Sequence, residues 1–234
     1  MCTVTFLPRR KGYYLGMNRD EKRTRPKGLP PALRTVNHRT VIYPSEPGGG
    51  TWIALNNRGV SLALINWYSV TARAKDNPIS RGMIIPPLCS AETTERVNSG
   101  LASLPLHQIN PFRLIGVFPG SQEIIEWRWD LNQLIQKCHR WRSQQWISSG
   151  FDEPTAQKVR SKTFRQAQAQ KSAGTISWLR RLHRSHSPQK GPFSTCMHRD
   201  DAVTVSYTEL CFTHGRASMR HTRGAPCSNL SSGA

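Results

Sequence analysis

A strand–turn–strand unit at the start of the sequence constrains the fold most. Residues 3–6 read Thr-Val-Thr-Phe, which is the two-residue alternation of a β-strand. Residues 9–12 read Arg-Arg-Lys-Gly, a polar turn, and the Tyr-Tyr-Leu run after it favours a second strand. We therefore expect an antiparallel hairpin with strands at 3–8 and 12–17.

The outer ends of this hairpin meet, and both carry reactive side chains. Cys2 stands at one end, and the run Asn18-Arg19-Asp20-Glu21 follows the other, where we expect the second strand to stop. A small second residue permits removal of the initiator methionine, which would leave a thiol and a free α-amine on Cys2. An α-amine has an ordinary pKa of about 7.7–8.0 and a thiol of about 8.5. Near neutral pH the amine can therefore act as the base for its own nucleophile.

The neighbours of Cys2 have expected roles in that chemistry. Arg19 would favour the thiolate, and Asp20 would hold or orient the ammonium group. Two plainer interpretations stay open. Cys2 can be a small apolar residue on a buried strand, and the Asn-Arg-Asp-Glu run can be a solvated turn.

Several short motifs occur in a specific order: Met1-Cys2, Asn18-Arg19-Asp20-Glu21, Gly49-Gly50-Thr51-Trp52, Asn57-Arg58-Gly59 and Asn66. In these motifs the chain resembles the NRDE family, also called the Transport and Golgi organisation protein 2 family. That family is related to N-terminal nucleophile (Ntn) hydrolases such as the choloylglycine hydrolases and penicillin V acylases. The resemblance is dense over residues 1 to about 70, thin to about 150, and weaker around 196–227.

The resemblance implies a fold and a set of site residues. The fold is the four-layer αββα sandwich of Ntn hydrolases. Cys2 would be the nucleophile, Asp20 would orient its amine, and Arg19 would tune local charge or bind an anionic substrate. Asn66 would donate to the oxyanion, a contact that typically contributes about 2.7–4 kcal/mol to transition-state stabilisation. The plainer alternative for Asn66 is that it caps the turn after its strand.

Further residues are expected to bind substrate. The glycines before Thr51 and Trp52 let the backbone pass close to something bulky, either a substrate or a packed neighbour, and the resemblance puts this run at the edge of the pocket. Related hydrolases carry a second oxyanion-binding Asn near 147–151, where this chain offers only serine hydroxyls. That departure weakens the enzyme hypothesis. The expected substrate-binding residues are Asn18, Gly50, Thr51, Trp52 and Ser149.

The remaining patterns predict an α+β domain of antiparallel hairpins with segregated helices. Residues 22–50 resemble a loop with one short strand near 41–43, and the Pro-Pro pair in 80–88 should interrupt a helix. Trp141 and Trp146 flank an Arg, which suits either base stacking or ordinary packing. Thr204, Ser206 and Thr208 should share one strand face. Expected strands lie at 51–56, 60–66, 112–118, 123–129, 203–210 and 214–221, with helices near 91–104 and 155–185.

Composition bounds the function. The 234 residues suit one domain, which we place at 1–227, with a flexible tail at 228–234. The net charge of +19 implies affinity for polyanions or anionic ligands, or simply a basic surface. No apolar run reaches the length of a membrane helix or of a signal peptide, so we expect a cytoplasmic protein. The six scattered cysteines form no Cys-x-x-Cys pair, and His183 with His186 suits a flexible polar loop better than a metal site, so we expect no metal or cofactor.

Three hypotheses for function follow. The first is an amidase-like acyl-transfer enzyme that acts through Cys2 on a small, acidic amide. The second, implied by the family resemblance, is a non-catalytic carrier or trafficking factor for a lipid or haem ligand. The third is a polyanion-binding protein, which rests on the net charge alone.

Overall fold

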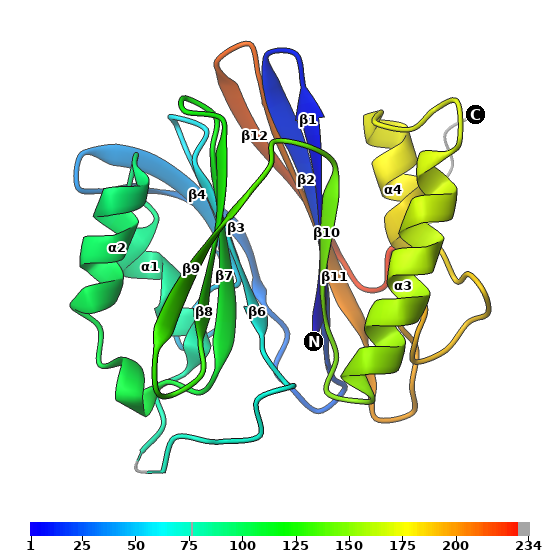
Figure 1. Cartoon of the computed structure of the whole chain (residues 1–234), viewed down its shortest axis with the longest axis horizontal. Helices are drawn as coiled ribbons and strands as arrows, with labels where there is room; N and C mark the ends of the chain where they lie inside the picture. Colours follow the sequence, from blue (N-terminus) through cyan, green and yellow to red (C-terminus); the bar gives the residue numbers. More distant parts are fainter. Residues whose placement is uncertain (76, 229–234) are drawn as a thin grey trace.

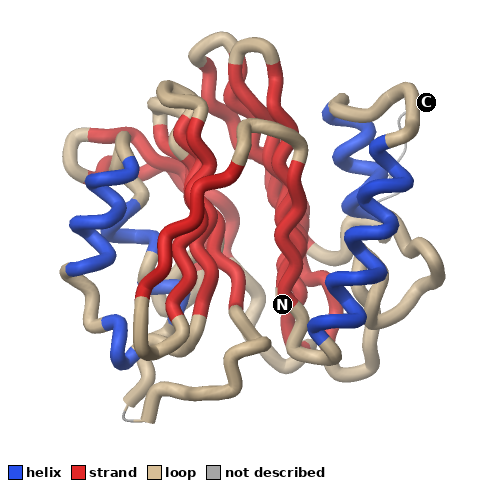
Figure 2. Tube along the Cα trace, in the orientation of Figure 1, coloured by secondary structure: helices blue, strands red, loops and turns tan. Residues whose placement is uncertain are grey.

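Two antiparallel sheets lie face to face in the computed structural model, and helices cover both outer faces (Figures 1 and 2). The structure describes residues 1–75 and 77–228, so the tail predicted at 228–234 lies outside the described residues except for its first residue. The layers run helix, sheet, sheet, helix, so the expected four-layer α+β sandwich is confirmed.

The first sheet has five strands in the order β10-β1-β2-β11-β12. The N-terminal hairpin lies at its centre, and β1 pairs along its whole length with β2. The C-terminal hairpin extends the sheet on the β2 side, and β10 closes the other edge. The strands are β1 (Cys2–Arg9), β2 (Gly12–Lys22), β10 (Gln144–Ser148), β11 (Ala202–Thr213) and β12 (Arg216–Arg223).

The second sheet is a meander of seven strands in sequence order, β3 to β9. Its central strands β6 and β7 are almost wholly buried, as expected for strands covered on both faces. The strands are β3 (Leu29–Val36), β4 (Arg39–Ser45), β5 (Ile53–Asn56), β6 (Ser61–Asn66), β7 (Phe112–Phe118), β8 (Glu123–Trp129) and β9 (Leu134–His139).

Each sheet carries its own pair of helices. The short α1 (Ile85–Leu88) and α2 (Thr94–Ala102) cover the seven-stranded sheet, and α3 (Glu153–Gln168) and α4 (Ile176–Arg184) cover the five-stranded one (Figure 1). A 3-10 turn at Arg81–Met83 precedes α1, which agrees with the helix interruption that the Pro-Pro pair predicts.

Alternating side chains divide the interior into three apolar layers. One face of β1 and β2 packs between the sheets, with Phe6 and Leu15 in that layer. Leu7, from the other face, packs against Trp178 and Leu179 of α4. A third layer lies between the seven-stranded sheet and α1 and α2. The two faces of β1 therefore contact different neighbours. Alternate residues along the strand lie between the sheets or under the helices.

Two predictions about strands were wrong. The second strand does not stop at residue 17: β2 continues through Lys22, so Asn-Arg-Asp-Glu is buried strand rather than a solvated turn. Residues 22–50 are not mostly loop, because β3 and β4 form a hairpin there. β3 is an edge strand, which tolerates the missing N–H groups of Pro30 and Pro31, and its pairing with β4 shifts register at those prolines.

A third prediction was wrong at β11. The register between β2 and β11 shifts between Thr204 and Ser206, so Thr204 pairs with Asp20 and Ser206 pairs with Arg19. Adjacent residues of β2 point to opposite faces. The bulge therefore places Thr204 on the helix face and Ser206 and Thr208 on the inter-sheet face, instead of all three on one face.

Residues 131–149, for which no element was predicted, form β9 and β10, and the chain crosses there from one sheet to the other. Trp141 lies at the crossing, with its ring 4.8 Å from the ring of Phe6. Trp146 is buried on β10 and stacks edge-on with His139 at 5.5 Å. Both tryptophans follow the packing interpretation rather than base stacking.

A buried ionic cluster fixes β10 against the second sheet. The fully buried Glu126 on β8 accepts hydrogen bonds from Arg113 at 2.6 Å, His139 at 2.8 Å and Arg128 at 3.0 Å. Arg113 also donates to the carbonyl of Ile147 at 3.1 Å. Burial alone would raise the pKa of Glu126, but these hydrogen bonds and charges outweigh it and hold the pKa well below the usual range.

Substituting Glu126→Gln should lower the free energy of unfolding at pH 7 by about 3 kcal/mol, because it leaves buried Arg113 without its carboxylate. Because the pKa of Glu126 is lower in the folded state than in the unfolded state, where it is about 4.3, ionised Glu126 stabilises the protein above about pH 4.3. This stabilisation is lost as the pH falls toward the folded-state pKa. Urea titrations between pH 3 and 7 check both effects. The exposed Glu123→Gln on the same strand is the matched control and should change stability by less than about 0.5 kcal/mol. Equal effects of the two substitutions would contradict the cluster's role.

Candidate functional site

The N-terminus lies against the end of β2, as the predicted hairpin requires. Cys2 pairs with Arg19 across the β1–β2 ladder and with Ser148 on its other side. The Met1 ammonium donates to the carbonyl oxygen of Asp20 at 2.9 Å, and the Asp20 N–H donates to the Met1 carbonyl at 2.8 Å. The thiol, the chain terminus and the Asn-Arg-Asp-Glu run are therefore neighbours.

One row of polar side chains crosses the inter-sheet face of the five-stranded sheet. Directly paired residues share a face, so Ser148, Cys2, Arg19 and Ser206 form this row across four strands. The hydroxyls of Ser148 and Ser206 are buried and have no hydrogen-bond partner among the described residues. Buried hydroxyls normally find partners, so two unpaired ones in a row with a thiol mark this face as unusual.

Carboxylates of the protein already balance the charge of Arg19. Its guanidinium lies 2.5 Å from Glu46 and 3.5 Å from Glu21, and it stacks 4.3 Å above the ring of Trp52. Only 5% of its side chain is exposed. The arrangement holds Arg19 rigidly beside the thiol and leaves little of its charge for a substrate.

Asn18 and Asp20 point the other way, toward the helices. Asp20 accepts from Thr204 at 2.7 Å and from the buried Arg160 of α3 at 3.4 Å. Asn18 donates to the backbone carbonyls of His183 and Thr195 at 2.9 and 2.8 Å. Their side chains therefore tie β2 to the helix layer.

A cavity of about 330 Å³ opens beside Cys2. Five of the nine predicted site residues line it: Cys2, Arg19, Thr51, Trp52 and Asn66. An adjoining cavity of about 490 Å³ includes Asp20 and shares Met1, Glu21, Arg25, Asn66 and Arg81 with the first. Asn66 ends β6 at the junction of the two cavities, where its amide donates to the Tyr68 hydroxyl at 2.7 Å.

The other predicted residues are held by local contacts. Gly50 packs against Gly82, where an added Cβ would come within 3.1 Å of backbone, so the packed-neighbour alternative describes this glycine. The Ser149 hydroxyl donates to the Phe151 carbonyl at 2.6 Å within a turn. Ser148, the direct neighbour of Cys2 on β10, is the free hydroxyl of the pair.

Arg81 is a site residue that the sequence patterns did not single out. It lines both cavities and donates to the Pro111 carbonyl at 3.2 Å. No carboxylate of residues 1–75 or 77–228 lies within ion-pair distance of it, and burial lowers its pKa. Its position in a kinked helix start resembles an ordinary polar turn, so only the fold reveals it.

Electrostatics at Cys2 differ from the expectation. Burial raises the pKa of the thiol most; the adjacent amine lowers it, Asp20 and Glu21 raise it, and Arg19 lowers it least of these groups. Arg19 therefore does not secure a thiolate while Met1 is present. For the Met1 ammonium, burial lowers the pKa, but the acidic groups around it, with Cys2 first, outweigh burial and raise the pKa to about 10.

Comparison with known proteins agrees with this geometry. The family model described as Transport and Golgi organisation 2 matches residues 1–140. The chain belongs to that family. Residues 1–140 include the N-terminal hairpin, the cavity side chains of β6 and the whole seven-stranded sheet. No curated protein sequence matches significantly.

Solved structures of Ntn hydrolases share the fold of this family member. Penicillin V acylase from Agrobacterium tumefaciens aligns over 95% of this chain and 83% of its own, with a TM-score of 0.56 and 10% identity. A mutant conjugated bile acid hydrolase from Clostridium perfringens aligns over 95% and 92%, with a TM-score of 0.52 and 10% identity. The family and fold expected from the short motifs are thus confirmed.

Within the described ranges, no helix combines the length and apolar character needed to cross a membrane.

In the chain that retains Met1, Cys2 should react with iodoacetamide slowly at pH 7.5 and faster as pH rises above 9, because burial disfavours its thiolate. Peptide mass spectrometry after timed labelling gives the rate for each cysteine. The exposed Cys138 on β9 is the internal reference and should label faster at pH 7.5. Labelling of Cys2 at the same rate as Cys138 would show that the thiol is not suppressed.

Proposed function

We propose that this protein is an Ntn-type hydrolase that cleaves a linear amide through Cys2 after removal of Met1. The observation that supports it most is the shared cavity: the Cys2 thiol, the chain terminus and the Asn66 amide all line it. A nucleophile, an adjacent base and an oxyanion donor are the three groups that acyl transfer requires.

In the proposed reaction the Cys2 α-amine accepts the thiol proton, and the sulfur attacks the amide carbonyl. The resulting oxyanion accepts a hydrogen bond from Asn66. Collapse of this intermediate breaks the C–N bond, and the protonated amine returns its proton to the leaving amine. Water then attacks the thioester, the amine again acting as base, and releases the carboxylic acid with the free thiol.

Asp20 acts on the amine through its backbone and its charge. With Met1 present, its carbonyl accepts a hydrogen bond from the Met1 ammonium at 2.9 Å, a contact that is lost when Met1 is removed, and its carboxylate on the helix face favours an ammonium form of the nearby chain terminus. Removal of Met1 also deprives the Asp20 N–H of its acceptor, so that N–H can donate into the vacated space. Ser148 is a better second oxyanion donor than Ser149, because its hydroxyl shares the face of Cys2 and has no described partner.

The preferred substrate carries a carboxylate. Arg19 and Arg25 in the cavity are paired with Glu46, whereas Arg81 lacks a described carboxylate partner. A substrate carboxylate beside Arg81 would supply the missing charge. Thr51 and Trp52, which lie just before β5, form part of the cavity wall. Gly50 packs behind them against Gly82, and Asn18 ties β2 to the helix layer.

Two chains that differ by one residue test the proposal. A protease-released fusion yields a chain that begins at Cys2, and a second fusion yields the same chain with Met1 retained. We expect the first to hydrolyse members of a panel of N-acyl amino acids and the second to be inactive, since its amine lies on the wrong residue. Amine release measured by fluorescamine labelling gives the rates.

The nucleophile has its own control. Cys2→Ala in the chain lacking Met1 should abolish turnover, and the thioester on Cys2 should be trapped by mass spectrometry after rapid acid quench. Turnover that survives Cys2→Ala would end the proposal. If the chain lacking Met1 is folded and inactive on the whole panel but binds an acyl chain or haem stoichiometrically, the carrier hypothesis takes its place.

Arg81→Met should raise KM for a carboxylate substrate about tenfold or more while leaving kcat nearly unchanged, because a charge-assisted hydrogen bond contributes about 1.5–3 kcal/mol. The methyl ester of the same substrate should be almost unaffected. The exposed Arg96→Met on α2 is the control and should behave as the parent protein. Equal loss on acid and ester would mean that Arg81 shapes the cavity instead of binding the carboxylate.

A further inference from the structure

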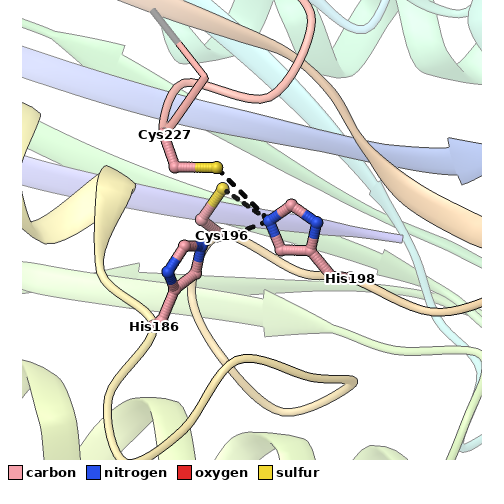
Figure 3. A group of neighbouring side chains, drawn as sticks. All are labelled: His186, Cys196, His198 and Cys227. Atoms are coloured by element: carbon pink, nitrogen blue, oxygen red, sulfur yellow. Dashed lines mark hydrogen bonds between the residues drawn. The ribbon is translucent and has the colours of Figure 1, made fainter. Parts of the chain in front are cut away.

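Four metal-ligating side chains from three separate segments meet near the start of β11 (Figure 3). His186 follows α4, Cys196 and His198 precede β11, and Cys227 follows β12. One ligand atom from each lies within 4.8 Å of every other. The sequence patterns gave no reason to expect this cluster, because residues between 186 and 227 follow no metal-site spacing.

The pair His183 and His186 behaves differently from the polar loop predicted for it. His183 is a buried residue of α4, with its ring nitrogen 3.0 Å from the Thr5 hydroxyl. His186 instead turns toward the cysteines. Only His186 therefore belongs to the cluster.

Hydrogen bonding alone does not account for the convergence. The Nε2 atom of His198 lies 3.2 Å from His186 Nε2, 3.6 Å from Cys196 Sγ and 3.3 Å from Cys227 Sγ. An imidazole nitrogen offers one proton or one lone pair. It cannot satisfy three polar neighbours at once, whereas an ion at their centre would bind all four atoms.

The three separations from His198 Nε2 match a tetrahedral zinc site, and the other separations in the cluster are within 4.8 Å. With Zn–N bonds of about 2.05 Å and Zn–S bonds of about 2.3 Å, two nitrogens lie about 3.3 Å apart and a nitrogen and a sulfur about 3.6 Å apart. The three printed separations fall within about 0.3 Å of those values. Tetrahedral sulfur–nitrogen donor sets favour zinc, and two thiolates balance its charge.

We propose that His186, Cys196, His198 and Cys227 bind one zinc ion. All four positions of the tetrahedron are protein side chains, which is the arrangement of a structural site rather than of one that activates water. None of these four residues lines the two cavities beside Cys2.

Backbone hydrogen bonds already hold the segments in place for the metal. The Cys196 N–H donates to the Ser185 carbonyl at 3.0 Å, and the His198 N–H donates to the Gly191 carbonyl at 3.1 Å. Between the two ligands, the Met197 N–H donates to Thr204, which in turn donates to Asp20. The ion would thus fasten the chain after β12 to the segment that supports Asp20.

Metal analysis of the full-length, tag-free chain tests the site. Protein purified with a reductant and without chelator should contain about one zinc per chain by plasma mass spectrometry. Cys227→Ser should lose it, and the exposed Cys138→Ser should keep it. A chelator should lower the melting temperature of the parent chain by about 5 °C or more and leave that of Cys227→Ser unchanged.

Cobalt gives a readout that does not depend on the folding of a variant. Adding Co²⁺ to the metal-free, reduced parent chain should produce the visible d–d bands and thiolate charge-transfer band of a tetrahedral sulfur–nitrogen site. The proposal is overturned if the parent chain holds no zinc and gives no such bands, or if Cys227→Ser retains a full equivalent. A Cys196–Cys227 disulfide that persists under reductant, seen as a loss of two hydrogens in mass, would also overturn it.

Discussion

The register between β1 and β2 is the constraint on which the candidate site depends. It sets Cys2 opposite Arg19 on the face between the sheets, and it sets Asp20, one residue further on, under the helices. Because strand side chains alternate, a slip of β2 by one residue against β1 would move Arg19 to the helix face and Asp20 to the face between the sheets. The same hydrogen-bonded ladder therefore presents the thiol to the cavity and anchors β2 to α3.

Charge is organised by pairing, although the chain as a whole is strongly basic. Arg19, Arg113 and Arg160 are buried, and each lies within ion-pair distance of a carboxylate, on Glu46, Glu126 and Asp20 respectively. A buried charge without a partner is costly, so these pairs let a chain with a net charge of +19 keep arginines inside. Arg81 beside the Cys2 cavity departs from that pattern, because no carboxylate among the described residues lies within ion-pair distance of it.

Local sequence patterns predicted the hairpins that form between strands adjacent in the sequence. Both hairpins of the five-stranded sheet and the β5–β6 and β7–β8 pairs join strands that follow directly along the chain, so β-forming runs and turn composition were sufficient to predict them. β3 was missed because Pro30 and Pro31 suggest a loop, and only an exposed sheet edge admits them. The faces of Asp20 and Thr204, and the meeting of His186 with Cys227, depend on contacts distant in sequence that no local pattern encodes.

The single extra residue at Val205 has a consequence for how relatives of this chain are compared. Everything in β11 after the bulge is offset by one position from the alternation set before it. An alignment that puts the corresponding gap a few residues away would match inward side chains of one protein to outward side chains of another. Equivalent residues of β11 in two relatives should therefore be identified by their cross-strand partners, here Thr204 with Asp20 and Ser206 with Arg19, and not by their distance along the sequence.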